Sequence, residues 1–131
     1  MSTKYPKINN KTNIVFFTGA GMSAESGIPT YRGSGGIWHK YNWEEYACQD
    51  AFNNDPQKVV EFHNIRREKT ADCMPNTGHL IIADLQNEFE NIDIITQNID
   101  GLHQLAGSKN IQELHGSLWW GRCENCLEDI D

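Results

Sequence analysis

The topology of this chain is set by the stretch Gly19-Ala-Gly-Met-Ser-Ala-Glu-Ser-Gly-Ile-Pro-Thr-Tyr-Arg32. An apolar, β-rich run from Ile14 to Phe17 precedes it, which is typical of a buried strand. The spacing Gly19-x-Gly21-x-x-Ala24 matches the strand–turn–helix fingerprint of a dinucleotide site. In that fingerprint the first glycine allows a tight turn, the second lets a diphosphate approach, and the third small residue lets the helix pack on the strand. The stretch therefore predicts an α/β fold with a phosphate-binding turn.

Glycine turns of this kind are common without any ligand, so the residues that follow carry more of the argument. Gly27-Ile-Pro29 stops the helix after little more than one turn, because proline disfavours helical geometry in the preceding residue. Residues 31–36 then form a glycine-rich loop that could fold over a cofactor. A hydride-transferring dehydrogenase is the weaker alternative, because it would need a longer first helix and an acid at the end of a second strand.

Composition argues against several classes of partner. The net charge of −7 disfavours nucleic acid and anionic membranes, because both need a basic face. No apolar run reaches transmembrane length, and the polar N-terminus lacks the apolar core of a secretory signal. The four cysteines do not resemble a secreted disulfide framework, so we expect a reducing, cytoplasmic location. The oligomeric state is not predicted.

Periodicity and capping residues divide the rest of the chain into elements. We expect a flexible arm at 1–12 and strands at 13–18, 92–96 and 111–114. We expect helices at 22–26, 43–48, 56–69 and 77–88, and a short one ended by Gly107. In the helix at 56–69, Val59, Val60, Phe62 and Ile65 are expected to form one apolar stripe. Alternating strands and helices predict a parallel sheet, whose ligands bind beyond the carboxyl ends of the strands.

Polar residues follow two of these strands. Gln97-Asn-Ile-Asp100 follows the strand at 92–96, and His115-Gly116 follows the strand at 111–114. Taken alone, such residues are as often turn formers and caps, and a single histidine is more often structural than catalytic. Their place at the same sheet edge as the glycine turn favours a binding site there.

Two further patterns have both a simple and a functional explanation. Cys123-Glu-Asn-Cys126 has the spacing of half a tetrahedral zinc site, with a redox pair as the alternative. His63 and Arg66 lie three residues apart on one helix face, where a solvated polar surface is the simpler explanation.

Four motifs in this order resemble the sirtuin (Sir2) family of NAD-dependent protein-lysine deacylases. They are the stretch from Gly19 to Arg32, Thr96 to His103, Glu113 to Gly116 and the two cysteines at 123 and 126. The resemblance covers about residues 13–126. It implies NAD, a structural Zn²⁺ and an acylated-lysine protein or peptide substrate. It also implies a Rossmann-like sheet from residues 13–40 and 90–116, a helical segment at 41–89 and the start of a zinc-ribbon module at 117–131.

The resemblance also implies roles for single residues. His115 stands where the family has its general base, Asn98 and Asp100 where it lines the nicotinamide pocket, and Gln97 where it bonds a ribose hydroxyl. The other implied cofactor-binding residues are Gly19, Ala20, Gly21, Met22, Ser23, Glu25, Thr30, Tyr31, Arg32, Trp38 and Ile99. The family more often has phenylalanine at the position of Tyr31. Cys123 and Cys126 match two of its four zinc-binding cysteines.

The acyl preference depends on the helix at 56–69. In an acidic-acyl branch of the family, Tyr-x-x-Arg grips the carboxylate of succinyl- or malonyl-lysine. Arg66 matches that arginine, a cationic fork suited to carboxylates, and His63 stands in place of the tyrosine. The implied activity is deacetylation, with desuccinylation or demalonylation open, and it transfers the acyl group to ADP-ribose with release of nicotinamide.

The 131 residues are few for this family. A sirtuin catalytic domain is nearly twice as long, so we expect a truncated N-terminal part of one. The alternative function is that of a non-catalytic remnant that binds NAD or ADP-ribose. ADP-ribosyl transfer is a further outcome within the same chemistry.

Overall fold

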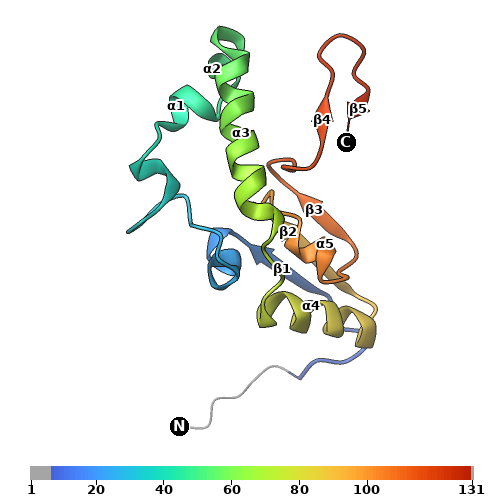
Figure 1. The fold of residues 1–131 in the computed structure, drawn as a ribbon. Coiled ribbons are helices and arrows are strands. Elements are labelled where there is room, and N and C mark those ends of the chain that lie inside the picture. Colours follow the sequence, from blue (N-terminus) through green and yellow to red (C-terminus); the bar gives the residue numbers. More distant parts are fainter. Residues whose placement is uncertain (1–6, 131) are drawn as a thin grey trace.

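A computed structural model describes residues 7–130, which form a parallel sheet with helices against one face and beyond one end (Figure 1). The sheet has three strands in spatial order, β1 (Ile14–Thr18), β2 (Ile92–Thr96) and β3 (Ile111–Glu113). Thr18 pairs with Thr96, and Thr96 with Glu113, so all three strands end at one edge. The predicted α/β fold with a parallel sheet is therefore confirmed, although β3 ends one residue earlier than expected.

The sheet is covered on one face only within the described residues. On that face lie Ile92 and Ile94, which are 1% and 0% exposed, and the helices α4 (Thr77–Glu88) and α5 (Leu102–Leu105). The opposite face carries Val15 and Phe17, which are 54% and 64% exposed. Parallel sheets are normally covered on both faces. The described chain thus presents one uncovered apolar sheet surface.

The residues between β1 and α4 form short helices and one long helix. They are η1 (Ala20–Ser26), η2 (Ile37–His39), α1 (Trp43–Tyr46), α2 (Gln49–Asn54) and α3 (Pro56–Ala71). In Figure 1, α1–α3 stand above the end of the sheet from which the strands lead into their loops. The helix expected at 22–26 is a 3₁₀ helix that begins at Ala20. It ends at Ser26, and Gly27 follows with a φ of 91°, in the left-handed region that favours glycine.

The single helix expected at 43–48 is wrong. It is broken after Tyr46, and a second helix, α2, follows that the sequence did not predict. The break lies at Cys48, whose backbone is extended and whose Sγ accepts from the Ala51 N–H at 3.4 Å. Cysteine is not among the residues that usually cap helices, so this start gave no sequence signal.

An aromatic cluster holds the helical segment together. Phe62 of α3 is 3% exposed, and its ring centroid lies 6.1, 5.0 and 4.9 Å from those of Trp38, Tyr41 and Tyr46. The expected apolar stripe on this helix is therefore narrower than predicted. Val59 and Phe62 are buried, whereas Val60 and Ile65 are 48% and 43% exposed.

The remaining segments contribute little to the sheet. A hairpin of β4 (Gly121–Arg122) and β5 (Asp129–Ile130) extends away from it and carries both cysteines of the C-x-x-C (Figure 1). Of the expected arm at 1–12, residues 1–6 lie outside the described residues, and residues 7–13 form no helix or strand. No helix among the described residues has the length and apolar character needed to span a membrane.

Candidate functional site

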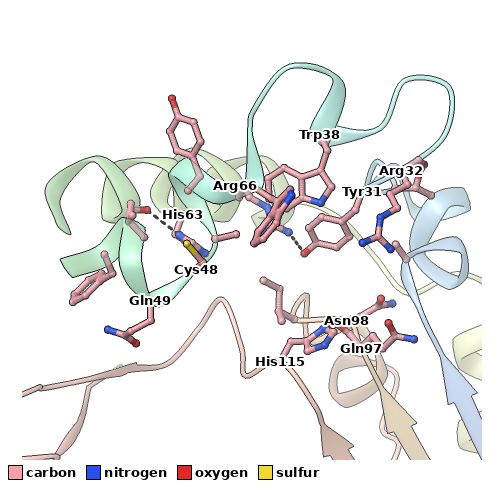
Figure 2. A pocket seen from close by; sticks show the side chains of 18 of the residues that line it. Tyr31, Arg32, Trp38, Cys48, Gln49, His63, Arg66, Gln97, Asn98 and His115 are labelled. Carbon is pink, nitrogen blue, oxygen red and sulfur yellow. Dashed lines mark hydrogen bonds between the residues drawn. The ribbon is translucent and has the colours of Figure 1, made fainter. Parts of the chain in front are cut away.

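A pocket of about 900 Å³ lies between the strand ends, the loop after η1 and the helices α1–α3. Figure 2 shows His115, Gln97 and Asn98 on one side and Tyr31, Trp38, Arg66 and His63 facing them. The pocket brings together most of the residues predicted for the site: Ala20, Gly21, Thr30, Tyr31, Arg32, Trp38, His63, Arg66, Gln97, Asn98, Ile99 and His115. The tertiary structure therefore places the cofactor-binding and acyl-recognition candidates in one cavity.

The glycine turn opens directly onto this pocket. A side chain built at Gly21 would meet nothing within 4 Å, so the backbone there can be approached closely. Gly19 has a φ of −143°, an extended conformation that any residue adopts. The tight turn that this glycine was expected to allow is closed by the Met22 N–H, which donates to the Gly19 carbonyl at 2.9 Å, and it requires no positive φ at Gly19.

Behind the pocket wall, a buried polar network joins η1 to the segment after β2. Ser23 is 0% exposed, and its Oγ donates to Asp100 Oδ2 at 2.7 Å. Asn98 Nδ2 donates to Ser23 Oγ and to the Gly19 carbonyl, each at 3.1 Å. The Leu102 N–H donates to Asp100 Oδ1 at 2.9 Å. Ser23 and Asp100 do not line the pocket, and the bonds that they make here fix the Gln97–Asp100 segment against the glycine turn.

Besides Ser23, four residues predicted to bind the cofactor lie outside the lining of the pocket. Gly19, Met22 and Glu25 do not line the pocket, although Met22 packs beside Gly78 at the start of α4. Asp100 was expected to accept a hydrogen bond from nicotinamide, but it is only 7% exposed and both of its oxygens accept bonds from the chain. The roles of these residues stay predictions.

His115 projects into the pocket from the end of β3. Its Nδ1 lies 3.1 Å from the Gln97 carbonyl oxygen. Because a carbonyl oxygen only accepts, Nδ1 carries the ring proton in this bond. Nε2 of the neutral ring is then an unprotonated acceptor, which is the form that a general base requires.

The loop over the pocket is held in place by hydrogen bonds between its two ends. The Ile37 and Trp38 N–H groups donate to the carbonyls of Thr30 and Tyr31, at 2.9 and 3.1 Å. The rings of Tyr31 and Trp38 lie 5.5 Å apart. Gly36 lies against the backbone of Tyr31 and Arg32 with no room for a side chain, because a Cβ there would lie 2.8 Å from the Tyr31 carbonyl oxygen. The loop therefore presents an ordered aromatic wall to the pocket.

Two basic residues of α3 lie in the same wall. Arg66 Nη2 donates to the Tyr31 hydroxyl at 2.5 Å, and the guanidinium lies 4.9 Å from the centroid of the Tyr31 ring. His63 Nδ1 lies 2.8 Å from the Val59 carbonyl oxygen. Burial lowers the pKa of His63 below its usual range, and the charges of Arg66 and Arg67 lower it further.

Several pocket residues escaped prediction from the sequence. They come from α1, α2 and α3 and are mainly apolar or aromatic: Trp43, Tyr46, Ala47, Cys48, Gln49, Phe52 and Val59. The aromatic residues at 43, 46 and 52 are visible in the sequence as candidates for a packed wall. Their convergence on the pocket depends on the break between α1 and α2, which was not predicted.

The two cysteines at the hairpin are the residues predicted to bind a metal ion. The pKa of Cys123 is lowered because backbone N–H groups of Cys126 and Asn125 stabilise its thiolate. Within residues 7–130, no three His, Cys, Asp or Glu side chains come together in a group that could hold a metal ion. Two sulfur donors do not complete the four-coordinate site of structural zinc. A closed zinc site therefore does not fit the described residues.

This arrangement defines an α/β protein in which a glycine turn, strand-end amides and a histidine surround one cavity. The chain belongs to the Sir2 family, since a model of that family matches residues 19–131. It is 52% identical over 114 residues to an NAD-dependent protein deacylase of Aquifex aeolicus, an alignment that covers 87% of this chain and 48% of the relative. The recognition of the family from four motifs is thereby confirmed.

Two further comparisons agree. The mitochondrial NAD-dependent protein deacylase sirtuin-5 of Danio rerio is 49% identical over 120 residues, covering 88% of this chain and 39% of the relative. A solved Sir2 homologue mutant in complex with ADP-ribose superposes with a TM-score of 0.85 at 43% identity, covering 92% of this chain and 48% of that one. The chain thus spans about half the length, or less, of the relatives that it matches.

Proposed function

We propose that this chain acts in NAD-dependent protein-lysine deacylation. The observation that carries the proposal is the convergence of His115, the Gln97–Asn98 segment and the glycine turn on one pocket. The names of the relatives point to the same activity. In such a reaction NAD supplies an activated ribose carbon and a nicotinamide leaving group.

The residues of the chain suit a dinucleotide. The backbone at Ala20 and Gly21 offers an open approach for a diphosphate, and Arg32 lies in the lining of the same pocket. No Asp or Glu of the described residues lines the pocket, so none of their carboxylates would repel an anionic ligand there. Gln97 and Asn98 would bind the ribose and nicotinamide parts, and the loop at 30–38 would exclude water from the reacting atoms.

His115 would be the base. Its Nδ1–H bond to the Gln97 carbonyl directs the free Nε2 lone pair away from the backbone. From there it would take a proton from a ribose hydroxyl and so promote acyl transfer to the sugar. The acyl-lysine would enter beside α3, with an acetyl group or an acidic acyl group near Arg66.

Zinc would contribute structure and no chemistry. We propose that the Cys123 and Cys126 thiolates are half of a zinc site, and that tight binding needs two more sulfur donors. The cytoplasmic location stays a prediction.

The test is release of nicotinamide from NAD in the presence of an acetyl-lysine peptide. Exchange of His115 for alanine should lower kcat/KM by about 10² to 10⁴, the usual contribution of a general base. The matched control is His39→Ala, since His39 is exposed and outside this pocket. Equal loss in both variants, or none in the His115 variant, would contradict the assignment. Binding of ADP-ribose without any turnover by the wild type would favour the non-catalytic alternative.

A further inference from the structure

Arg66 is a cation that has no acidic partner within residues 7–130. The ion pairs of the described residues join Lys58 to Glu45 and Arg122 to Asp129, and neither involves Arg66. The chain is rich in acidic residues, yet none of those within residues 7–130 lines the pocket into which Arg66 points. Its guanidinium is only half-buried and has N–H groups left after the bond to Tyr31. An anionic group on the ligand would complete this site.

His63 is poorly arranged to help bind such an anion. Its Nδ1 proton is donated to the Val59 carbonyl, within the same helix. In the neutral ring, Nε2 is then an acceptor. A carboxylate oxygen is also an acceptor, so the two would repel each other and form no hydrogen bond. Burial favours that neutral ring by lowering the pKa of His63. The donor role considered for His63 from the sequence is therefore not favoured by this geometry.

Tyr31 has the hydrogen-bonding capacity that His63 lacks. The Tyr31 oxygen accepts from Arg66 Nη2, which leaves its own O–H proton as a donor. Among the hydrogen bonds of the described residues, that proton has no acceptor. Contact with a cation also strengthens a phenol as a donor. Tyr31 O–H and the free Arg66 N–H groups therefore form a paired set of donors facing the pocket (Figure 2).

We propose that Tyr31 is the second carboxylate-binding residue of the acyl pocket and acts with Arg66 in selecting acidic acyl-lysine substrates. This inference rests on the proposed deacylase function. It assigns the second donor to Tyr31, on the loop that covers the pocket, and not to His63 on α3. Phenylalanine at residue 31 would retain the aromatic wall but lose the donor. A bound acidic acyl group would thus tie the loop to α3 through one carboxylate.

The experiment measures binding of a succinyl-lysine peptide and an acetyl-lysine peptide by calorimetry, without NAD. The wild type should bind the succinyl peptide more tightly. The Tyr31→Phe variant should lose about tenfold in affinity for the succinyl peptide, the range of a hydrogen bond to a charged group, and the succinyl-to-acetyl ratio should fall with it. In an Arg66→Gln background the same exchange should change the affinity by less than about twofold, because the two residues act as one unit.

The control variant is Tyr41→Phe, which removes a phenol from the same aromatic cluster without touching the pocket. It should match the wild type. Circular dichroism of each variant verifies the fold, which Tyr31→Phe should retain because its ring still packs on Trp38 and Arg66.

Several results would overturn the inference. They are equal wild-type affinities for the two peptides, absence of binding, an equal loss for both peptides in Tyr31→Phe, or a tenfold succinyl-specific loss in His63→Ala with none in Tyr31→Phe. The proposed function fails separately, by absence of nicotinamide release. Turnover of acetyl peptide without a succinyl preference would leave the function standing and refute the role of Tyr31.

Discussion

At the scale of single residues, the direction of a few hydrogen bonds determines what the site can do. The bond from Nδ1 to the Gln97 carbonyl makes His115 a competent base, whereas the bond from Nδ1 to Val59 makes His63 a poor donor. Both are histidines beside the same pocket, and the sequence does not distinguish them in this respect. In both rings Nε2 is left as the acceptor, which suits a base that takes a proton from a hydroxyl but not a residue that must donate to a carboxylate.

Two buried histidines under the sheet predict a pH dependence of stability. The rings of His79 and His103 lie 4.8 Å apart, and both are at most 2% exposed. Burial, together with the neighbouring His79, lowers the pKa of His103 from 6.5 to about 4. Burial lowers the pKa of His79 as well. The folded state therefore favours neutral rings, while the unfolded chain takes up protons as the pH falls below 6.5.

We expect the free energy of unfolding to have its full value above pH 6.5, where both rings are neutral in the folded and the unfolded chain. It should decrease as the pH falls from 6.5 towards 4. The loss due to His103 should reach about 3 kcal/mol at the acid end. Urea unfolding at pH 7 and pH 5 measures it, with His103→Gln as the variant in which the slope should flatten. An equal free energy at both pH values in the wild type would contradict the burial argument.

At the scale of elements, α4 illustrates how a helix cap connects two parts of the site. Asn76 Oδ1 accepts from the Gly78 N–H at 2.9 Å, as an N-cap does. Its Nδ2 also donates to the Met22 carbonyl at 2.7 Å and to Ser26 Oγ at 3.0 Å. The cap therefore holds η1, and with it the glycine turn, against α4.

Exchange of Asn76 for alanine should cost more than loss of an ordinary cap. We expect about 2 kcal/mol, the upper end for N-caps, because the bonds to η1 are lost as well. The matched control is Asn42→Ala, which removes the cap of α1, a local bond to the Glu44 N–H. Thermal unfolding of both variants measures the difference, and equal destabilisation would show that the bonds to η1 contribute nothing.

The elements that the sequence predicted well share a strong local signal. The helix at 77–88 and the strand at 92–96 were predicted with their observed ends, since an asparagine cap and a β-branched run mark them. The break between α1 and α2 was missed because it rests on a cysteine cap and on packing against α3. Local patterns cannot report such tertiary contacts.

At the scale of the whole molecule, the two faces of the sheet differ in burial. Ile92 and Ile94 form the core with α4 and α5, while Val15 and Phe17 face outward on the other side. Exposed apolar side chains in a row promote association with other apolar surfaces. The pair of strands β1 and β2 thus contributes to the core on one face and to an exposed apolar surface on the other.

Variants on each face test how much that face of the sheet contributes to stability and to the exposed apolar surface. Val15→Thr with Phe17→Thr should reduce binding of an apolar dye and change the free energy of unfolding by less than about 1 kcal/mol, because both side chains are exposed. Ile94→Ala should cost about 2 to 5 kcal/mol, because it leaves a cavity in the core. Dye fluorescence and urea unfolding test both statements. A large loss of stability from the outer pair would mean that this face is packed.

The sequence by itself determined the family, the parallel sheet and the residues that line the strand-end half of the pocket, because these depend on short motifs and on periodicity. The tertiary structure alone decided that the Arg66 guanidinium donates a hydrogen bond to Tyr31, thirty-five residues away in the sequence. It also decided that Ser23 and Asp100 form a buried hydrogen bond. It also decided that His63 donates within its own helix. Each of these is a contact between side chains whose rotamers and partners are set by packing, which no local pattern encodes.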